Sequence, residues 1–324
     1  MACRSAMGDS MRDSLRSFLR RLRPAFGVLL VGGSVLLAAA AATQAANPFW
    51  DALLGKLGHV KVDPERVLAQ QPELIKRAIA SLAPQRPGVT DLYFVGLAGD
   101  YREAVFRREV ASVTRLFDNR FGTKGRSLTL VNSPQTIATL PLATPRNLRR
   151  ILAQIGGIMD REQDVLLLFL TSHGAPDEFW IDAGPVDADP LSSDDLKEML
   201  NDSGIKWRVL VISACHSGSF INELWDAHTL LITAAREDRT SFGCSSERDW
   251  TYFGEAYFDR ALRHELSFVT AFDQAEKAIA QREKQDDLTP SLPQMRIGRL
   301  IGPKLAELER TVRALPQAAS IEAP

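Results

Sequence analysis

The chain of 324 residues contains few of the residues that bind metals, with only three cysteines and five histidines. The histidines stand at positions 59, 173, 216, 228 and 264, and none has the short spacing to a second ligand that metal sites show. We therefore expect neither a metal nor a cofactor.

The chain also lacks an excess of charge, because its net charge is -1 at pH 7. No stretch interleaves arginines with aromatic residues, so we do not expect a nucleic-acid partner. A content of 45% hydrophobic and 24% charged residues is typical of a globular protein, and the length allows one large domain with extensions.

The first 46 residues have the pattern of an export segment. Several arginines precede Pro24, no charged residue occurs from there to Trp50, and an apolar stretch leads to small residues ending at Ala46. We favour a signal peptide cut near Ala46; an uncleaved anchor through residues 25–42 is the alternative. Either would place the rest outside the cytoplasm, in the periplasm or secreted, with membrane association in the anchored form.

The remaining chain divides into a helical lead-in at 47–89, an alternation of strands and helices at 90–302, and an Ala-rich tail at 303–324. The strand candidates are nearly unbroken runs of Val, Leu and Ile, which is typical of parallel strands buried on both faces. We predict a three-layer α/β/α sandwich with a mostly parallel central sheet of about six strands.

Two of these apolar runs end in reactive residues. "DVLLLFLTSHG" carries His173 and Gly174, and "RVLVISACHSGS" carries Cys215. Working groups collect at the carboxyl ends of parallel strands, and strands consecutive in sequence are usually neighbours. We therefore expect the imidazole and the thiol to lie on one edge of the sheet.

This pair suits acyl transfer. A cysteine thiol with an unperturbed pKa of about 8.5 needs a neighbouring base, and the imidazole can also protonate a leaving amine. The backbone N–H groups of Gly174 and Cys215 are the natural donors to an oxyanion. A helix that begins near Ser217 would direct its positive end at the sulfur.

Several further segments resemble one enzyme family. "ACHSGSF", "LLITAAREDRTSFGC", "DWTYFGEAYF" and "GDYREAVFRREV" are similar to segments of the legumain-type cysteine peptidases, in the clan of the caspases and gingipains. The resemblance covers about 91–298 and indicates an exported bacterial member with a caspase-like fold.

The resemblance assigns roles to the matching residues. Cys215 is then the nucleophile and His173 the general base and acid, while Asp100 stands where the family has an Asn that orients the histidine. The substrate pocket of the family corresponds to four positions here: Arg102, Ser213, Thr240 and Glu255. One pocket acid of the eukaryotic enzymes is replaced by Ser213, which weakens a preference for Asn and favours acceptance of Asp.

Two other residues near the motifs receive structural interpretations. His216 is expected to face away from the nucleophile, and Cys244 to pack in a loop. A bridge between Cys215 and Cys244 is the alternative for an exported domain.

The leading hypothesis is therefore a cysteine endopeptidase that acts on protein or peptide substrates after Asn or Asp. A transamidase that uses the same thioester is one alternative. A catalytically silent, caspase-like binding module is the other.

Overall fold

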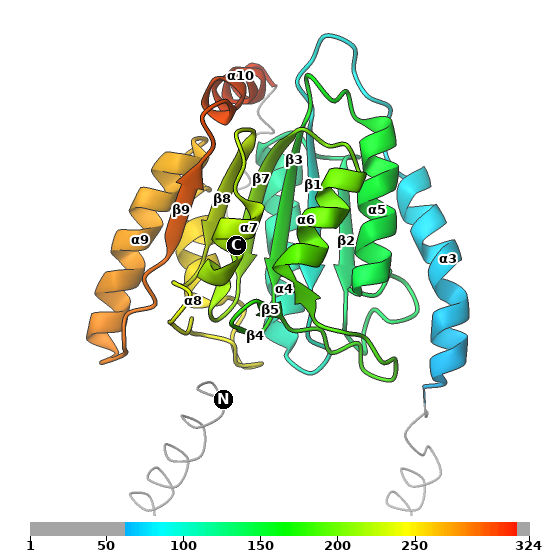
Figure 1. Ribbon diagram of the computed structural model, residues 1–324, viewed down its shortest axis with the longest axis horizontal. Helices are drawn as coiled ribbons and strands as arrows, with labels where there is room; N and C mark the ends of the chain where they lie inside the picture. Colours follow the sequence, from blue (N-terminus) through cyan, green and yellow to red (C-terminus); the bar gives the residue numbers. More distant parts are fainter. Residues whose placement is uncertain (1–61, 316–324) are drawn as a thin grey trace, which may run out of the picture. The chain divides into compact units, whose positions relative to one another are not determined.

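The computed structural model describes residues 62–315 (Figure 1). The predicted export segment, the first part of the lead-in and the last residues of the tail lie outside this range. Within it, no helix is long and apolar enough to cross a membrane.

A six-stranded sheet forms the centre of the fold, in the order β2-β1-β3-β7-β8-β9. All neighbouring pairs are parallel except β8 with β9. This arrangement, with helices on both faces (Figure 1), confirms the predicted three-layer α/β class. The strands are β1 (Leu92–Ala98), β2 (Ser127–Val131), β3 (Val165–Thr171), β7 (Trp207–Ser213), β8 (Thr229–Thr233) and β9 (Gln294–Ile297).

Each face of the sheet has its own hydrophobic core. Alternate residues of β1 divide between the two, with Phe94 on one face and Tyr93 and Val95 on the other. Both β1 and β3 are buried along their whole length, which explains their unbroken apolar sequences.

The first face is covered by α4 (Ala104–Arg120), η2 (Glu255–Ala261), α9 (Phe268–Gln285) and α10 (Ile301–Ala314). The second is covered by α3 (Pro64–Ala80), α5 (Pro145–Ile158), α6 (Ser193–Asp202) and α7 (Ile221–Leu224).

Helix starts follow the sequence signals closely. Thr144 caps α5 by accepting a hydrogen bond from Asn147 N, and Pro145 occupies the first turn. Ser192 caps α6 in the same way through Asp195 N.

The lead-in contributes a packed helix. In α3, the Gln71 side chain accepts hydrogen bonds from Leu142 N and Asn147 Nδ2, and Ile75 joins the core of the second face. The described part of the lead-in is therefore attached to the sheet domain.

The segment after residue 302 differs from the expected tail. Most of its described part forms α10, whose Leu305, Leu308 and Val312 are buried in the core of the first face. Glu307 also accepts a hydrogen bond from Thr90 Oγ1, at 2.6 Å. These apolar side chains recur every three or four residues among alanines and charged residues, which explains why the helix resembled a tail in the sequence.

Candidate active site

The ends of β3 and β7 lie side by side in register. Thr171 is the Cα partner of Ser213, and Ser172 N donates to Ser213 O at 3.2 Å. His173 and Cys215 each follow two residues after this pair, so both stand at the same edge of the sheet. The expectation that the two strands are neighbours is confirmed.

Gly174 packs directly against the chain at Cys215. A Cβ atom at Gly174 would lie 2.6 Å from Cys215 O, which only glycine avoids. Gly174 belongs to a small antiparallel sheet of β4 (Gly174–Ala175), β5 (Glu178–Phe179) and β6 (Leu191–Ser192).

The direction of the Gly174 N–H follows from the pattern of this ladder. Trp180 N donates to His173 O at 3.0 Å, and Gly174 pairs with Phe179. Hydrogen-bonded and non-hydrogen-bonded pairs alternate in antiparallel ladders, so the Gly174 N–H points away from β5.

Cys215 carries a free, partly exposed thiol. Its Sγ accepts a hydrogen bond from Ser241 N at 3.3 Å and lies 3.6 Å from Ser241 O. The alternative of a bridge to Cys244 is therefore wrong. Cys244 is partly buried against the first-face core.

The backbone turns sharply after Cys215. His216 adopts a left-handed conformation with φ 59°, and its Nδ1 lies 2.9 Å from Glu237 O. The expected helix is only a short 3₁₀ turn, η1 (Ser217–Phe220), followed by the four-residue α7. So short a helix has little dipole, and the proposed stabilisation of the thiolate by a helix end is not supported.

Asp100 bridges His173 and the start of α4. Its Oδ2 lies 4.0 Å from His173 Nε2, while its Oδ1 accepts hydrogen bonds from Arg102 N at 2.7 Å and Glu103 N at 2.8 Å. The imidazole also contacts Phe106 edge-on, with ring centroids 5.2 Å apart. The two backbone hydrogen bonds therefore hold the Asp100 carboxylate beside the imidazole.

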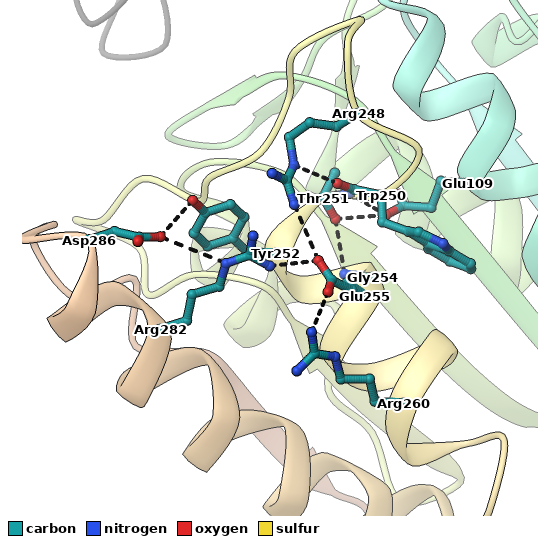
Figure 2. A network of polar contacts seen from close by, with 10 residues as sticks. All are labelled: Glu109, Arg248, Trp250, Thr251, Tyr252, Gly254, Glu255, Arg260, Arg282 and Asp286. Carbon is teal, nitrogen blue, oxygen red and sulfur yellow. Dashed lines mark hydrogen bonds and ion pairs between the residues drawn. The ribbon is translucent and has the colours of Figure 1, made fainter.

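Arg102 and Glu255 bind different partners. The Arg102 side chain is 76% exposed and pairs with Asp182 at 3.0 Å. Glu255 begins η2 and pairs with three other arginines, Arg248, Arg260 and Arg282 (Figure 2). The structure therefore does not bring Arg102 and Glu255 together as an ion pair.

Electrostatics keep Glu255 ionised. Its partial burial alone would raise the pKa of the carboxyl, but hydrogen bonds from Arg282 and Arg260 outweigh this and lower the pKa below its usual value. Arg282 and Arg248 also lie over the Tyr252 ring, at 3.7 and 5.0 Å from its centroid.

The other two predicted pocket residues occupy different environments. Ser213 is buried, and its Oγ lies 3.4 Å from Thr251 Oγ1. Thr240 is half-buried in the loop whose next residue, Ser241, contacts the Cys215 sulfur.

A buried carboxyl group behind this edge was missed at the sequence level. Glu109 of α4 is 0% exposed and accepts hydrogen bonds from Thr171 and Thr251. Its position was detectable, since it lies four residues after Val105 and four before Val113, both buried on the same helix face.

Among residues 62–315, no group of three or more His, Cys, Asp or Glu side chains could hold a metal ion. The groups present at the shared edge of β3 and β7 are the Cys215 thiol, the His173 imidazole, the Asp100 carboxylate and backbone N–H donors.

Comparison with known families adds a sequence match. A model of the Peptidase C13 family matches residues 145–303. This stretch contains both His173 and Cys215, while Asp100 precedes it. The match supports a cysteine peptidase and agrees with the resemblance carried by the motifs around the two residues.

Among solved structures, caspase-1 from Spodoptera frugiperda is similar to this chain, with a TM-score of 0.47 and 11% sequence identity. The alignment covers 67% of this chain and 93% of that caspase chain. No curated protein sequence matches the chain.

Proposed function

We propose that this protein is a cysteine endopeptidase in which Cys215 is the nucleophile and His173 the general base and acid. The observation that carries the proposal is the in-register pairing of β3 with β7, because it brings the two reactive residues to one edge of the sheet. The Peptidase C13 match over both residues supports the same reaction class.

The reaction proceeds through a thioester. The Cys215 sulfur attacks the carbonyl carbon of the scissile bond while His173 takes the thiol proton. The imidazolium then gives this proton to the leaving amine as the carbon–nitrogen bond breaks. Water, deprotonated by the same imidazole, hydrolyses the thioester and regenerates the thiol.

Backbone groups stabilise the charge that develops on the carbonyl oxygen. The Gly174 N–H points away from β5 and lies in a segment packed against Cys215, so it suits this role together with the Cys215 N–H. Asp100, at 4.0 Å from His173 Nε2, would orient the ring and stabilise its protonated form. Nδ1 is then the nitrogen that exchanges the proton with the sulfur.

We propose that cleavage follows Asn or Asp. Arg102 is two residues from Asp100, and its guanidinium is largely exposed. A guanidinium suits a carboxylate and can also donate to an amide oxygen. Asp182 neutralises part of this charge, which is consistent with acceptance of both side chains.

The test is labelling of the full chain with thiol-reactive peptide probes that carry Asn or Asp at the cleavage position. We expect Cys215 to be modified, and the modification to be lost in Cys215→Ala and strongly slowed in His173→Ala. His228→Ala is the matched control, because His228 packs on Trp207 at the opposite end of β7. Equal labelling of all variants, or labelling elsewhere, would contradict the proposal.

Hydrolysis and transamidation share the thioester and differ only in the acceptor. Cleavage of a peptide in the presence of an added amine, followed by mass measurement of the products, distinguishes them. We expect the free acid to dominate; complete conversion to the amide would favour the transamidase.

The proposed location is outside the cytoplasm, on the basis of the arginines and apolar stretch before Trp50. Fractionation of cells that express the full chain, with N-terminal sequencing of the product, would test export and cleavage near Ala46. Recovery in the cytoplasm with an intact N-terminus would contradict both.

A further inference from the structure

The carboxyl group of Glu109 is enclosed behind the catalytic edge. Its Oε2 accepts a hydrogen bond from Thr171 Oγ1 at 2.6 Å. Its Oε1 accepts from Thr251 N at 3.0 Å and from Thr251 Oγ1 at 2.7 Å (Figure 2). The residue has no exposed surface. Both carboxyl oxygens are therefore used within the protein.

These contacts join segments that are distant in the sequence. Thr171 ends β3 two residues before His173, and Thr251 is the N-cap of α8 (Tyr252–Gly254) four residues before Glu255. Thr251 Oγ1 also lies 3.4 Å from Oγ of Ser213, the last residue of β7. One carboxyl group thus connects the chain before His173, the chain before Cys215 and the segment that carries Glu255.

Packing around the carboxyl is close. A Cβ atom at Gly254 would overlap Glu109 Oε1, so only glycine at this position lets the α8 backbone lie this close to the carboxyl. Gly254 N in turn donates to Thr251 Oγ1 at 2.9 Å. The Thr251–Gly254 turn is therefore fixed on Glu109 by both shape and hydrogen bonds.

The environment of Glu109 favours the neutral acid. Burial raises the pKa of its carboxyl, and the hydrogen bonds from Thr171 and Thr251 offset this only in part. In the neutral acid, the proton on Oε2 is donated to Thr171 Oγ1, which reverses the direction of that bond, while Oε1 still accepts both bonds from Thr251. Glutamine has the same shape and can make the same set of bonds.

A buried carboxyl is an unfavourable choice for stability alone. Removing it from water costs free energy, and an apolar residue of similar volume is often as stable or more so. The carboxyl group adds structural specificity instead, because a satisfied network of hydrogen bonds selects one arrangement of the segments it joins.

We propose that Glu109 is a positioning residue that holds the His173 and Cys215 strand ends in register with the 251–255 segment. It acts through its hydrogen bonds to Thr171 and Thr251. This inference rests on the proposed peptidase function, since it concerns the alignment of that site.

The test compares four variants of the full chain with the wild type: Glu109→Ala, Glu109→Gln, Thr171→Val and Val113→Ala. Glu109→Ala removes the hydrogen bonds, and Glu109→Gln keeps them without a titrating group. Thr171→Val removes one hydroxyl at almost constant volume. Val113→Ala is the control, because it trims a buried side chain on the same face of α4, one turn further along.

Three quantities are measured for each variant: the midpoint of thermal unfolding, the rate of Cys215 labelling by the peptide probe, and kcat and KM for a peptide substrate. Assays are run well below every unfolding midpoint, so that the fraction folded is the same in all variants. A general loss of stability then leaves the kinetic constants unchanged, whereas misalignment of the site does not.

We expect kcat/KM of Glu109→Ala to fall about 100-fold, the loss that a misplacement of about 1 Å produces. Glu109→Gln should keep most of the activity, and Thr171→Val should lose it mainly through kcat, because that hydroxyl lies on the His173 side. Val113→Ala should unfold at lower temperature with wild-type kcat and KM.

Two results would overturn the inference: Glu109→Ala with kinetics like those of Val113→Ala, or Glu109→Gln as impaired as Glu109→Ala. Either can occur while the wild type labels at Cys215, which leaves the proposed function standing. A wild type that does not label at Cys215 would instead contradict the proposed function, and the inference with it.

Discussion

Thr171 of β3 and Ser213 of β7 are direct partners in a parallel ladder, and each ends its strand two residues before a reactive side chain. His173 and Cys215 therefore depend on the same backbone register. Any change that shifts one strand end relative to the other should be more harmful to catalysis than to folding.

Gly174→Ala tests this dependence. The new Cβ would lie 2.6 Å from Cys215 O, a backbone atom that cannot rotate away, so the two strand ends must separate. We expect kcat/KM to fall about 100-fold with the fold retained. Gly157→Ala on α5 is the matched control, because its Cβ would meet no atom within 4 Å and should leave activity unchanged.

Substitution of Asp100 should separate its two roles. Asp100→Ala removes the partner of His173 and the acceptor for Arg102 N and Glu103 N, so we expect a lower kcat and a loss of stability of about 1 kcal/mol. Asp100→Asn keeps an acceptor oxygen and should remain closer to wild type in both measurements. Wild-type kcat in Asp100→Ala would exclude Asp100 from the mechanism.

The Glu109 carboxyl should make stability depend on pH. Burial raises its pKa in the folded protein above the usual 4.5, so its contribution is fully present below that value and is lost as pH rises through the folded pKa. We expect the free energy of unfolding of the wild type, relative to Glu109→Gln, to decrease with rising pH. Denaturant titrations at a series of pH values measure this difference, and a difference independent of pH would contradict it.

Glu255 should behave in the opposite sense. Arg282 and Arg260 lower its pKa despite its partial burial, so its contribution is present above the usual 4.5 and is lost as pH falls through the lowered value. The wild type should therefore lose stability relative to Glu255→Gln on acidification. The same titrations, extended to acidic pH, provide the measurement; parallel curves for the two proteins would refute it.

Trp180 is expected to contact the substrate. Its side chain is 43% exposed, and its ring centroid lies 6.2 Å from that of His173. We expect Trp180→Ala to raise KM by roughly two- to tenfold, the value of one aromatic contact, with little change in kcat. Trp225→Ala is the control, because Trp225 is 53% exposed and follows α7. A similar rise in KM in Trp225→Ala would contradict a substrate contact at Trp180.

The sequence was sufficient for much of the fold because its signals are local. Unbroken apolar runs predicted β3 and β7, and the start of α5 has a local signal too, a capping Thr144 followed by Pro145. The helix α10 was missed, since its apolar residues are too sparse to distinguish a packed helix from a tail until the sheet surface that they cover is known.

The candidate site was also only partly predictable from the sequence. Strand order made it predictable that His173 and Cys215 share an edge, because parallel strands end on the same side. The partners of Arg102 and Glu255 were not predictable, since ion pairs form between segments brought together only by folding.

The sequence by itself therefore determined the α/β layers and the shared sheet edge of the His173 imidazole and the Cys215 thiol, because both follow from periodicity and strand order. Only the tertiary structure decided that Glu109, an ordinary helix residue in the sequence, lies enclosed between the ends of two strands and the start of α8. The reason is physical: hydrogen bonds to Thr171 and Thr251, 62 and 142 residues away, exist only after the core has closed around the carboxyl.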